Sequence, residues 1–553
     1  MLPQSADAAP SAPRPVSVGR LAALLVVALV IAALVLVPLL SELGATFRED
    51  VVLPPAAPIV ATDPGTATVV LGEPLTLDPA AAGDAGSAAV IAQLFEGLTT
   101  VDADLVVRPA LAEAWRFDDG GRTAVFQLRD GLTFSDGTPL VAADVVRSWL
   151  RVLDPVAPSP LASLLDDVVG AAEYRTGHGT ADGVGLTADG RTLTVHLTRP
   201  ATDFPAVVAS PTLAIVPPGA ARAGFVPGPG FVASGGYRPT SETTTGIVLE
   251  ANPRYWAGPP AIGRIEVKTS LDGRSPVQVF QDGEVDLTSI GSYDASWIAY
   301  DRDLGTSLRK GVSLSVEYLG FDTSSPPFDD ARVRRAFGTG VDWRRVVSLG
   351  TDGAEEVATS IVPPAIAGRT AADMLPPFDP EGARALLAEA GYPGGAGFPA
   401  ITFTSAGNPY ARAIADQLHE NLGVDVAVQT MEFSQYYDLL ETDPPPMWSV
   451  DWVADYPART ALLGLLLGPD QPNNFGRWTD PAYTVALAEG GAATDPAAAN
   501  AAFDRAEEIV RDQVPVVPLS YGTSWWLARD GLLGAGENGL GFIRLAGLAW
   551  ADR

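Results

Sequence analysis

The chain has 553 residues, of which 47% are hydrophobic and 18% are charged, a composition typical of a globular protein with two or three domains. Its formal net charge is −30, from 36 basic and 66 acidic residues, so its surface is expected to repel nucleic acid. The absence of cysteine excludes disulfides, thiolate metal ligands and the acylated cysteine of a bacterial lipoprotein.

The first predicted element is an apolar segment at residues 21–40, which carries no charge and is about long enough to cross a bilayer core. Arg14 and Arg20 precede it and acidic residues dominate after it, so the positive-inside rule places residues 1–20 in the cytoplasm. A cleaved signal peptide is the alternative, but its apolar region is about 7 to 15 residues long and ends at a small-x-small site. Because residues 43–45 match such a site poorly, an uncleaved single-pass transmembrane helix is favoured.

The next segment, residues 41–68, is predicted to be a linker. Its second part is rich in proline, alanine and valine and has no amphipathic period, which indicates a semi-rigid spacer. Folding is expected to begin near Val69. From there on, short β-type runs such as Ala124–Leu128 and Leu193–Leu197 alternate with helical stretches, the pattern of an α/β or α+β protein.

Two helices have clear end signals. Asp379-Pro380 predicts the start of a helix that runs to Ala390 and stops at Gly391. Asp495-Pro496 predicts the start of a second helix, which must end before Pro515. The inward face of this second helix is expected to carry Phe503, Ala506, Ile509 and Val510.

No catalytic or metal-binding pattern is found. No metal-ligand spacing joins the three histidines, which are His178, His196 and His419. The sequence has no G-x-S-x-G motif, and the glycine-rich run 224–236 lacks the Lys-Ser/Thr of a phosphate-binding loop, so it is expected to be an ordinary loop. Asp451 and Asp455 could form the carboxylate pair of a glycosidase, although two acids four residues apart are common in so acidic a chain.

The segment 452–457 (WVADYP) is the best candidate for a binding site. It places Asp455 between Trp452 and Tyr456, just before a turn at Pro457. A fixed carboxylate and aromatic ring faces suit an ammonium group, through a charge-assisted hydrogen bond and cation–π attraction. The alternative is that Asp455 only accepts a hydrogen bond from a backbone N–H in the turn.

A series of short motifs runs in order through the chain after Val69. The most specific is residues 126–140 (FQLRDGLTFSDGTPL), followed by an amphipathic helix with Val145, Trp149 and Val152 inward. The other motifs are LDP (77–79), LFEGL (94–98), PALAEAW (109–115), NPRYW (252–256), GEVDL (283–287), YLGFDT (318–323), PFDDARVRRA (327–336), AEAGY (388–392) and AEEI (506–509). In number and order they resemble the extracytoplasmic solute-binding proteins of peptide ABC transporters, solute-binding protein family 5. Ser159-Pro160-Leu161-Ala162 resembles the oligopeptide branch more than the dipeptide branch.

This resemblance implies an α/β, bilobal periplasmic-binding-protein-like fold of type II with an extra subdomain, preceded here by the predicted transmembrane helix. The two lobes are joined by a hinge and enclose the ligand on closure. By analogy, residues 69–95, 219–317 and 520–553 form lobe I, residues 96–218 the extra subdomain, and residues 318–519 lobe II.

The resemblance also implies roles for the candidate site residues. In the family, the aspartate of the W-x-A-D-Y motif binds the α-ammonium group of a peptide, and Asp455 matches it. Trp452 either lines the groove or only packs, and Tyr456 and Leu161 complete the predicted ligand-binding set. The peptide main chain is expected to add as an extended strand, with hydrated pockets that tolerate many side chains.

Some residues depart from the family pattern. Gly83 and Leu161 stand where relatives often carry an acidic and an aromatic residue. Residues 430–450 contain no basic residue, whereas relatives supply arginines there for a short peptide's carboxylate. Burying that carboxylate unpaired would be costly. Arg459 is a possible substitute, although a surface position is the commoner outcome for arginine.

The predicted function is therefore that of a membrane-anchored, monomeric solute-binding protein that captures oligopeptides or peptide-like ligands outside the cytoplasm and delivers them to ABC permease subunits. No enzyme activity, metal, cofactor or nucleic-acid partner is predicted. The alternative is a membrane-anchored receptor that senses a ligand without transporting it.

Overall fold

The computed structural model describes residues 65–551, except 221–224, 352–354 and 470, and these residues belong to one compact unit. The predicted transmembrane helix at 21–40 and most of the linker at 41–68 lie outside the described residues. Among the helices that are described, none combines the length and the apolar character needed to cross a bilayer.

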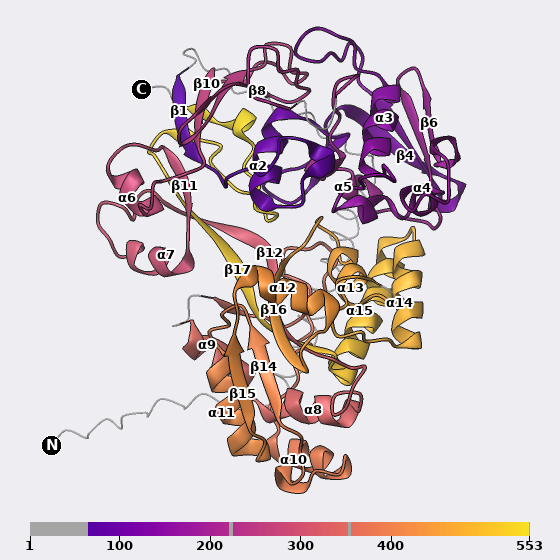
Figure 1. Cartoon of the computed structure of the whole chain (residues 1–553), viewed down its shortest axis with the longest axis vertical. Helices are drawn as coiled ribbons and strands as arrows, with labels where there is room; N and C mark the ends of the chain where they lie inside the picture. The colour runs from indigo at the N-terminus through magenta and orange to yellow at the C-terminus, as the bar shows by residue number, and fades with distance from the viewer. Residues whose placement is uncertain (1–64, 221–224, 352–354, 470, 552–553) are drawn as a thin grey trace, which may run out of the picture. The chain divides into compact units, whose positions relative to one another are not determined.

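A mixed eleven-stranded sheet organises the chain (Figure 1). Its strands, in spatial order, are β15 (Val426–Thr430), β14 (Ile401–Ser405), β16 (Met447–Val453), β12 (Leu308–Phe321), β17 (Val516–Ala528), β11 (Leu287–Ile290), β1 (Thr66–Val70), β10 (Arg264–Lys268), β9 (Gly246–Ala251) and β8 (Tyr237–Thr243), with β13 (Glu356–Val357) beside β17. The strands alternate with helices along the chain, which confirms the predicted α/β class.

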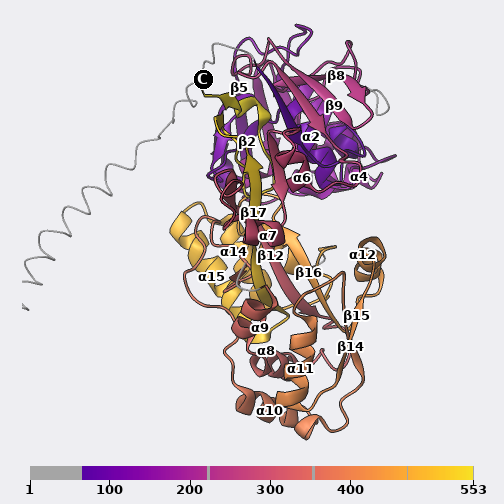
Figure 2. The ribbon, with the colours of Figure 1, turned by 90° about the vertical axis from the view of Figure 1, so that its left-hand side faces the viewer.

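The two longest strands, β12 and β17, join the two ends of this sheet. They pair antiparallel from Leu308 opposite Leu527 to Gly320 opposite Val516, with a register shift between Val312 and Val316. Figures 1 and 2 show them side by side, with β11 and β1 toward one end of the sheet and β16 and β14 toward the other.

Each end of the sheet has its own buried core. One core is formed largely by β1 and β8–β11, by α2 (Ala85–Leu94) and by the C-terminal residues from Trp526 on. The other draws its buried members from residues 319–519 and includes α8 (Ala331–Gly340), α9 (Trp343–Gly350), α10 (Pro380–Glu389) and α11 (Ala411–Leu422).

A smaller antiparallel sheet is inserted between α2 and β8. Its order is β4 (Ala112–Asp118), β5 (Thr123–Leu128), β7 (Thr192–His196) and β6 (Leu186–Asp189), which confirms both predicted strand runs. The helix α3 (Ala142–Val152) packs against this sheet and buries Val145, Trp149 and Val152, as predicted. The same region contains β2 (Thr99–Val101), β3 (Val107–Pro109), α4 (Ala171–Arg175) and α5 (Phe204–Val207).

The remaining elements complete the two ends of the sheet. The α-helices are α6 (Pro276–Gln281), α7 (Ser292–Ile298), α12 (Phe433–Thr442), α13 (Thr460–Leu467), α14 (Pro481–Ala492) and α15 (Pro496–Gln513), and a two-stranded sheet is formed by β18 (Leu532–Leu533) and β19 (Ala549–Trp550). The short 3-10 helices are η1 (Pro79–Ala81), η2 (Asp119–Gly121), η3 (Ala162–Leu165), η4 (Ala181–Gly183), η5 (Pro211–Leu213), η6 (Pro393–Gly395) and η7 (Leu545–Gly547).

The end signals of α10 and α15 act as predicted. Asp379 accepts a hydrogen bond of 2.9 Å from the Gly382 N–H, and Gly391, just past the helix end, has a φ of +101°. Asp495 caps α15, which ends two residues before Pro515. On the predicted inward face of α15, Phe503, Ala506 and Val510 are buried and Ile509 is half-buried. The described part of the run 224–236 forms a loop.

Arg459 is buried, with 3% of its surface exposed, so the prediction of a surface arginine is wrong. Its guanidinium pairs with Glu507 and lies 2.8 Å from Asp504. It also donates to the carbonyl oxygen of Gly368 at 2.9 Å. The acids Asp504 and Glu507 lie three residues apart on one face of α15 and supply charge partners to the terminal nitrogens of the guanidinium, whereas its Nε is buried without a hydrogen-bond partner among the described residues.

Replacing Arg459 with methionine should destabilise the fold by about 3–5 kcal/mol, because it leaves Glu507 buried without its cation. Urea unfolding measures the change. Arg412→Ala, which removes an exposed ion pair with Asp416, is the control and should cost little. Equal stabilities of the two variants would contradict the prediction.

Candidate functional site

The strand β16 ends in a free edge. It pairs with β12 along its whole length, from Met447 to Val453, but with β14 only at Met447 and Trp448. Among the described residues no strand pairs with the β14 side of β16 beyond that point. The Ser449 carbonyl oxygen accepts a hydrogen bond of 2.7 Å from Tyr436, and the rest of this edge can accept an extended chain as an additional strand.

Asp455 follows this strand directly. The loop is anchored by a hydrogen bond of 3.0 Å from the Ala454 N–H to the Leu314 carbonyl oxygen on β12. The Asp455 side chain is half-buried and makes no ion pair within the described part of the chain. Burial raises its pKa to about 6, and its own backbone N–H and the nearby Trp452 indole oppose part of the rise. A carboxylate held this way, without a cation, is well suited to bind an ammonium group.

The two aromatic residues of the segment play different parts. Trp452 is half-buried against the core, and its indole N–H is buried without a hydrogen bond of normal geometry. Tyr456 is only 6% exposed, and burial together with the nearby charge of Asp203 raises its pKa above the ordinary range. The structure therefore brings Trp452, Asp455 and Tyr456 together, with Tyr456 packed on the inner side.

Leu161 lies in a different part of the fold. It precedes η3 and is half-buried, and its N–H donates to the Ser159 hydroxyl at 3.2 Å. It is not among the residues that line the pocket beside Asp455.

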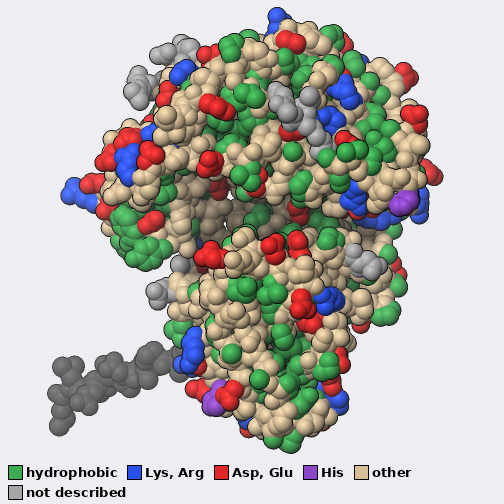
Figure 3. All heavy atoms as spheres, viewed as in Figure 1, with side chains coloured by type: hydrophobic (Ala, Val, Ile, Leu, Met, Phe, Trp, Pro, Cys, Tyr) green, Lys and Arg blue, Asp and Glu red, His purple; other side chains and the backbone are tan. Residues whose placement is uncertain are grey.

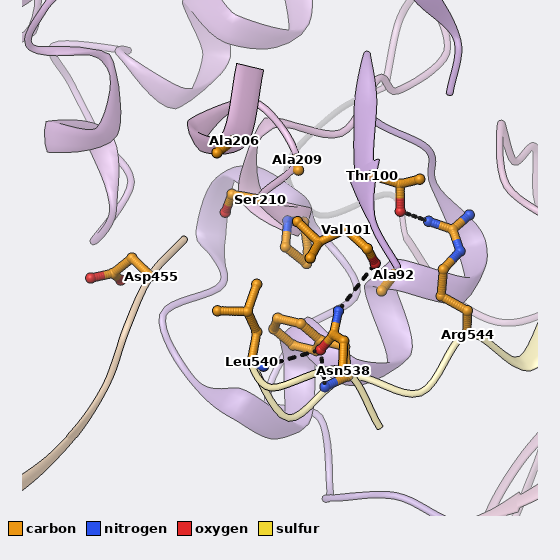
Figure 4. Close-up of a pocket in the computed structure, with 12 residues that line it drawn as sticks. Ala92, Thr100, Val101, Ala206, Ala209, Ser210, Asp455, Asn538, Leu540 and Arg544 are labelled. Carbon is orange, nitrogen blue, oxygen red and sulfur yellow. Dashed lines mark hydrogen bonds between the residues drawn. The ribbon is translucent and has the colours of Figure 1, made fainter. Parts of the chain in front are cut away.

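A small pocket that opens to solvent lies beside Asp455 (Figure 4). Its walls come from α2, β2, residues 206–211 and residues 538–544, and Asp455 lies at its edge. Figure 4 shows the Asp455 carboxylate directed away from Leu540 and Asn538, so it marks the rim of the pocket and not its floor. The sequence analysis missed the segments 206–211 and 538–544, because small and apolar loop residues carry no chemical motif.

Arg544 lies on the far wall of the pocket, where its charge is already paired. Its guanidinium donates to both carboxylate oxygens of Glu96, at 2.8 and 2.9 Å, and to the Tyr255 hydroxyl at 3.1 Å. The Glu96 charge raises the pKa of Arg544 despite its burial. Arg459 is likewise paired with Glu507 inside the protein. Neither arginine is free to bind the carboxylate of a ligand.

A second group of carboxyls lies next to the free edge. Glu317 on β12 is directly opposite Asp451 on β16, and within the described residues its carboxylate accepts one hydrogen bond, 2.5 Å long, from the Asn408 amide. Burial and the charges of Asp451 and Glu355 raise the pKa of Glu317 to about 8, and burial also raises the pKa of Asp451. Figure 3 shows acidic side chains gathered near α12. The surroundings of the free edge of β16 therefore favour the binding of cations over that of anions.

Within the described residues, no three acidic or histidine side chains converge in a way that could hold a metal ion. Glu317 and Asp451, which lie opposite each other on β12 and β16, interact with each other. The groups present, a carboxylate without a cation and a free strand edge, suit a positively charged, extended ligand.

The comparisons with known proteins agree on one family. The model described as "Bacterial extracellular solute-binding proteins, family 5 Middle" matches residues 106–474. A relative from Escherichia coli (strain K12), "Probable deoxycholate-binding periplasmic protein YgiS", is 32% identical over 468 residues, 81% of this chain and 86% of the relative. The "Oligopeptide-binding protein OppA" of Bacillus subtilis (strain 168) is 28% identical and covers 85% of this chain and 90% of its own.

Solved structures confirm the predicted bilobal α/β fold. The Escherichia coli murein tripeptide binding protein MppA has a TM-score of 0.74 and 26% identity, and it covers 90% of this chain and 100% of its own. The transmembrane helix that was predicted ahead of this fold is not part of that comparison, because it lies outside the described residues.

Replacing Glu317 with glutamine should flatten the pH dependence of stability. The pKa of Glu317 is raised in the folded protein to about 8, so its proton stabilises the fold at acidic pH, and this contribution is lost as pH rises from about 4.5 through 8. The melting temperature of the variant should therefore lie a few °C above that of the parent at pH 9 and close to it at pH 4. Thermal unfolding of both proteins between pH 4 and pH 9 measures the difference.

Glu73→Gln, at an exposed position, controls for the loss of one charge. If Glu317→Gln and Glu73→Gln follow the same pH profile, Glu317 does not hold its proton in the folded state.

Proposed function

Because the chain belongs to the bacterial extracellular solute-binding proteins of family 5, we propose that it captures oligopeptides or peptide-like ligands and delivers them to an ABC transporter permease. Proteins of this family bind solutes for transport outside the cytoplasm and are not enzymes, so the glycosidase hypothesis for Asp451 and Asp455 is set aside.

The observation that carries the proposal is the position of Asp455 at the end of the free edge of β16. A ligand ammonium group bonds to the carboxylate, and the ligand main chain adds to the edge at residues 450–453. Exclusion of water strengthens both interactions. Trp452 flanks the ammonium group, and Tyr456 supports the loop from its inner side.

Leu161 is the fourth proposed ligand contact, from the extra subdomain. It lies away from the pocket beside Asp455, so its contact would be with a more distant part of the ligand.

The proposed division of the chain follows the predicted boundaries. Lobe I consists of residues 69–95, 219–317 and 520–553, the extra subdomain of residues 96–218, and lobe II of residues 318–519. Support comes from the separate cores at the two ends of the sheet and from the inserted four-stranded sheet. The strands β12 and β17 cross from one lobe to the other and form the hinge.

The acidic surroundings favour a peptide-like amine over a bile acid. The relative YgiS is named for deoxycholate, which carries a carboxylate and no amine. In this chain a carboxylate would meet Asp455, Glu317 and Asp451, and the arginines described above are paired with acids of the protein.

Replacing Asp455 with asparagine should weaken the binding of a peptide with a free α-amine by about 10-fold or more, because a charged hydrogen bond is lost. Native mass spectrometry of the purified full-length chain identifies a bound peptide, and titration calorimetry measures the affinity. With the parent chain, affinity should also fall as pH drops below about 6, where Asp455 takes up a proton.

Two controls accompany this measurement. Asp182→Asn removes one exposed acid at a distant site and should bind as the parent does. The N-acetylated form of the same peptide should bind weakly to every variant. The ammonium site is refuted if Asp455→Asn binds the free amine as tightly as the parent.

The N-terminal segment is proposed to anchor a monomer in the membrane. Residues 21–40 would form a single-pass helix, residues 1–20 would lie in the cytoplasm, and residues 41–68 would tether the binding lobes on the outer side. This arrangement also suits the alternative function, a receptor that senses a ligand without transport.

The full-length tagged chain should remain with the membrane pellet after an alkaline wash and should co-purify from detergent with permease subunits and their ATPases. Light scattering of the extract should give the mass of one chain per particle outside that complex. Release into the wash would contradict the anchor. Recovery with a signalling kinase in place of a permease would favour the sensing receptor.

A further inference from the structure

Three aromatic side chains lie exposed in one short stretch of the chain that the proposed peptide site does not use. Tyr293, Trp297 and Tyr300 keep 82%, 42% and 93% of their surface exposed. Among the described residues, the only other aromatic residues with exposed side chains are Phe378 and Phe433. Because burial of aromatic surface is favourable, such a group on the surface indicates a contact with a partner.

These three residues share one face of α7 and of the turn that extends it. The helical hydrogen bonding continues past the end of α7, since the Tyr300 N–H donates to the Trp297 carbonyl oxygen at 3.1 Å. Residues at the spacing i, i+4 and i+7 lie on the same side of a helix. The opposite side of α7 buries Ala295 and Ile298. The helix is therefore held by its inner side, and its outer side carries Tyr293, Trp297 and Tyr300, which we call the aromatic stripe. Figure 3 shows hydrophobic side chains gathered over α7.

The charges beside the aromatic stripe do not form a basic patch. Asp294, Asp301 and Asp303 adjoin it in the sequence together with Arg302, and the Trp297 indole N–H donates to the Asp294 carboxylate at 3.3 Å. The whole chain carries a formal charge of −30, so an anionic surface would be repelled both locally and at longer range. The stripe therefore suits a partner that is amphipathic and has no net charge.

A lipid–water interface has this character and lies within reach of the stripe. Tyrosine and tryptophan collect at such interfaces, because each combines an apolar ring with a polar tip. Residues 41–64 separate the proposed anchor from the first described residue, and a chain of that length spans at most about 75 Å. The strand that follows, β1, pairs with β11 at Val69 and Leu287, and α7 begins two residues after β11 ends. The stripe therefore belongs to the part of the fold that the tether enters.

We propose that the aromatic stripe is a docking surface for the lipid–water interface of the membrane in which the chain is anchored, and that its rings, not its charges, make the contact. The inference rests on the proposed anchor and is independent of the peptide site. Because a tether keeps the local concentration of the surface high, a weak affinity is enough. The stripe lies in proposed lobe I, so docking would hold that lobe at the membrane and leave lobe II free to move on the hinge.

The test places a fluorescent label beside the stripe in the purified full-length chain, reconstituted in phosphatidylcholine vesicles. Because the chain has no cysteine, Ser296→Cys at an exposed position of α7 takes a single label. Nitroxide groups on the lipid headgroups should lower the emission of this label by about 2-fold or more, because an interfacial helix lies within about 5–10 Å of the headgroups. High salt should not restore the emission. Ala497→Cys, at an exposed position of α15, is the matched control and should keep its emission.

Removal of the rings makes the test specific. A triple variant that combines Tyr293→Ser, Trp297→Gln and Tyr300→Ser should abolish the quenching of the label at residue 296. Its melting temperature and its affinity for a peptide with a free amine should stay close to those of the parent, because the three side chains are exposed. Phe378→Ser, at an exposed aromatic position outside the stripe, is the control and should keep the full quenching.

The outcomes separate this inference from the proposed function. Quenching that the triple variant loses and Phe378→Ser keeps supports the lipid surface. If the chain floats with the vesicles but the label is not quenched, the lipid surface is overturned and the anchor stands. If the chain does not float, both are overturned, and the peptide site is unaffected.

Two other partners of the stripe would give different results. Without quenching in pure lipid, loss of permease co-purification in the triple variant would assign the stripe to the permease. A change from two chains per particle in the parent to one in the triple variant, by light scattering, would assign it to a second copy of the chain. Either result overturns the lipid surface.

Discussion

The pairing of β12 with β17 is the constraint on which the rest of the structure depends. These strands, 14 and 13 residues long, belong to both ends of the main sheet, and each end has its own core. The strand β16 is held on β12 along its full length, so the position of Asp455 is set by the same pairing. Because the register shifts between Val312 and Val316 and again between Glu317 and Tyr318, the ladder is interrupted between its two halves, where a bend breaks few hydrogen bonds.

The carboxyls beside the free edge of β16 destabilise the folded state and favour the binding of a cation. Glu317 and Asp455 have pKa values raised mainly by burial, which means that the protein provides too little compensation for their charges. A cation that enters the site supplies that compensation. Binding should therefore release protons near neutral pH and stabilise the folded state, because the ligand pairs with charges that the protein leaves unpaired.

Local signals predicted the scaffold well and the walls of the site poorly. The caps of α10 and α15 and the buried face of α3 follow from residues within one or two turns of the chain, and the structure confirms them. The partners of Arg459 and the pocket wall at residues 538–544 depend on long-range packing. Glu507 is 48 residues from Arg459, so no local pattern could predict that the guanidinium is buried. Asp455 could be proposed as a site residue from the sequence because its motif is local.

The proposed site combines three separate segments, so binding there would be coupled to a change in conformation. The carboxylate belongs to the loop after β16, the apolar wall to residues 206–211, and the opposite wall to residues 538–544. A ligand that touches all three binds best to conformations in which they are adjacent. Because the ligand binds these conformations more tightly than others, it shifts the population toward them. The size of the shift is limited by the difference in binding free energy that these contacts provide.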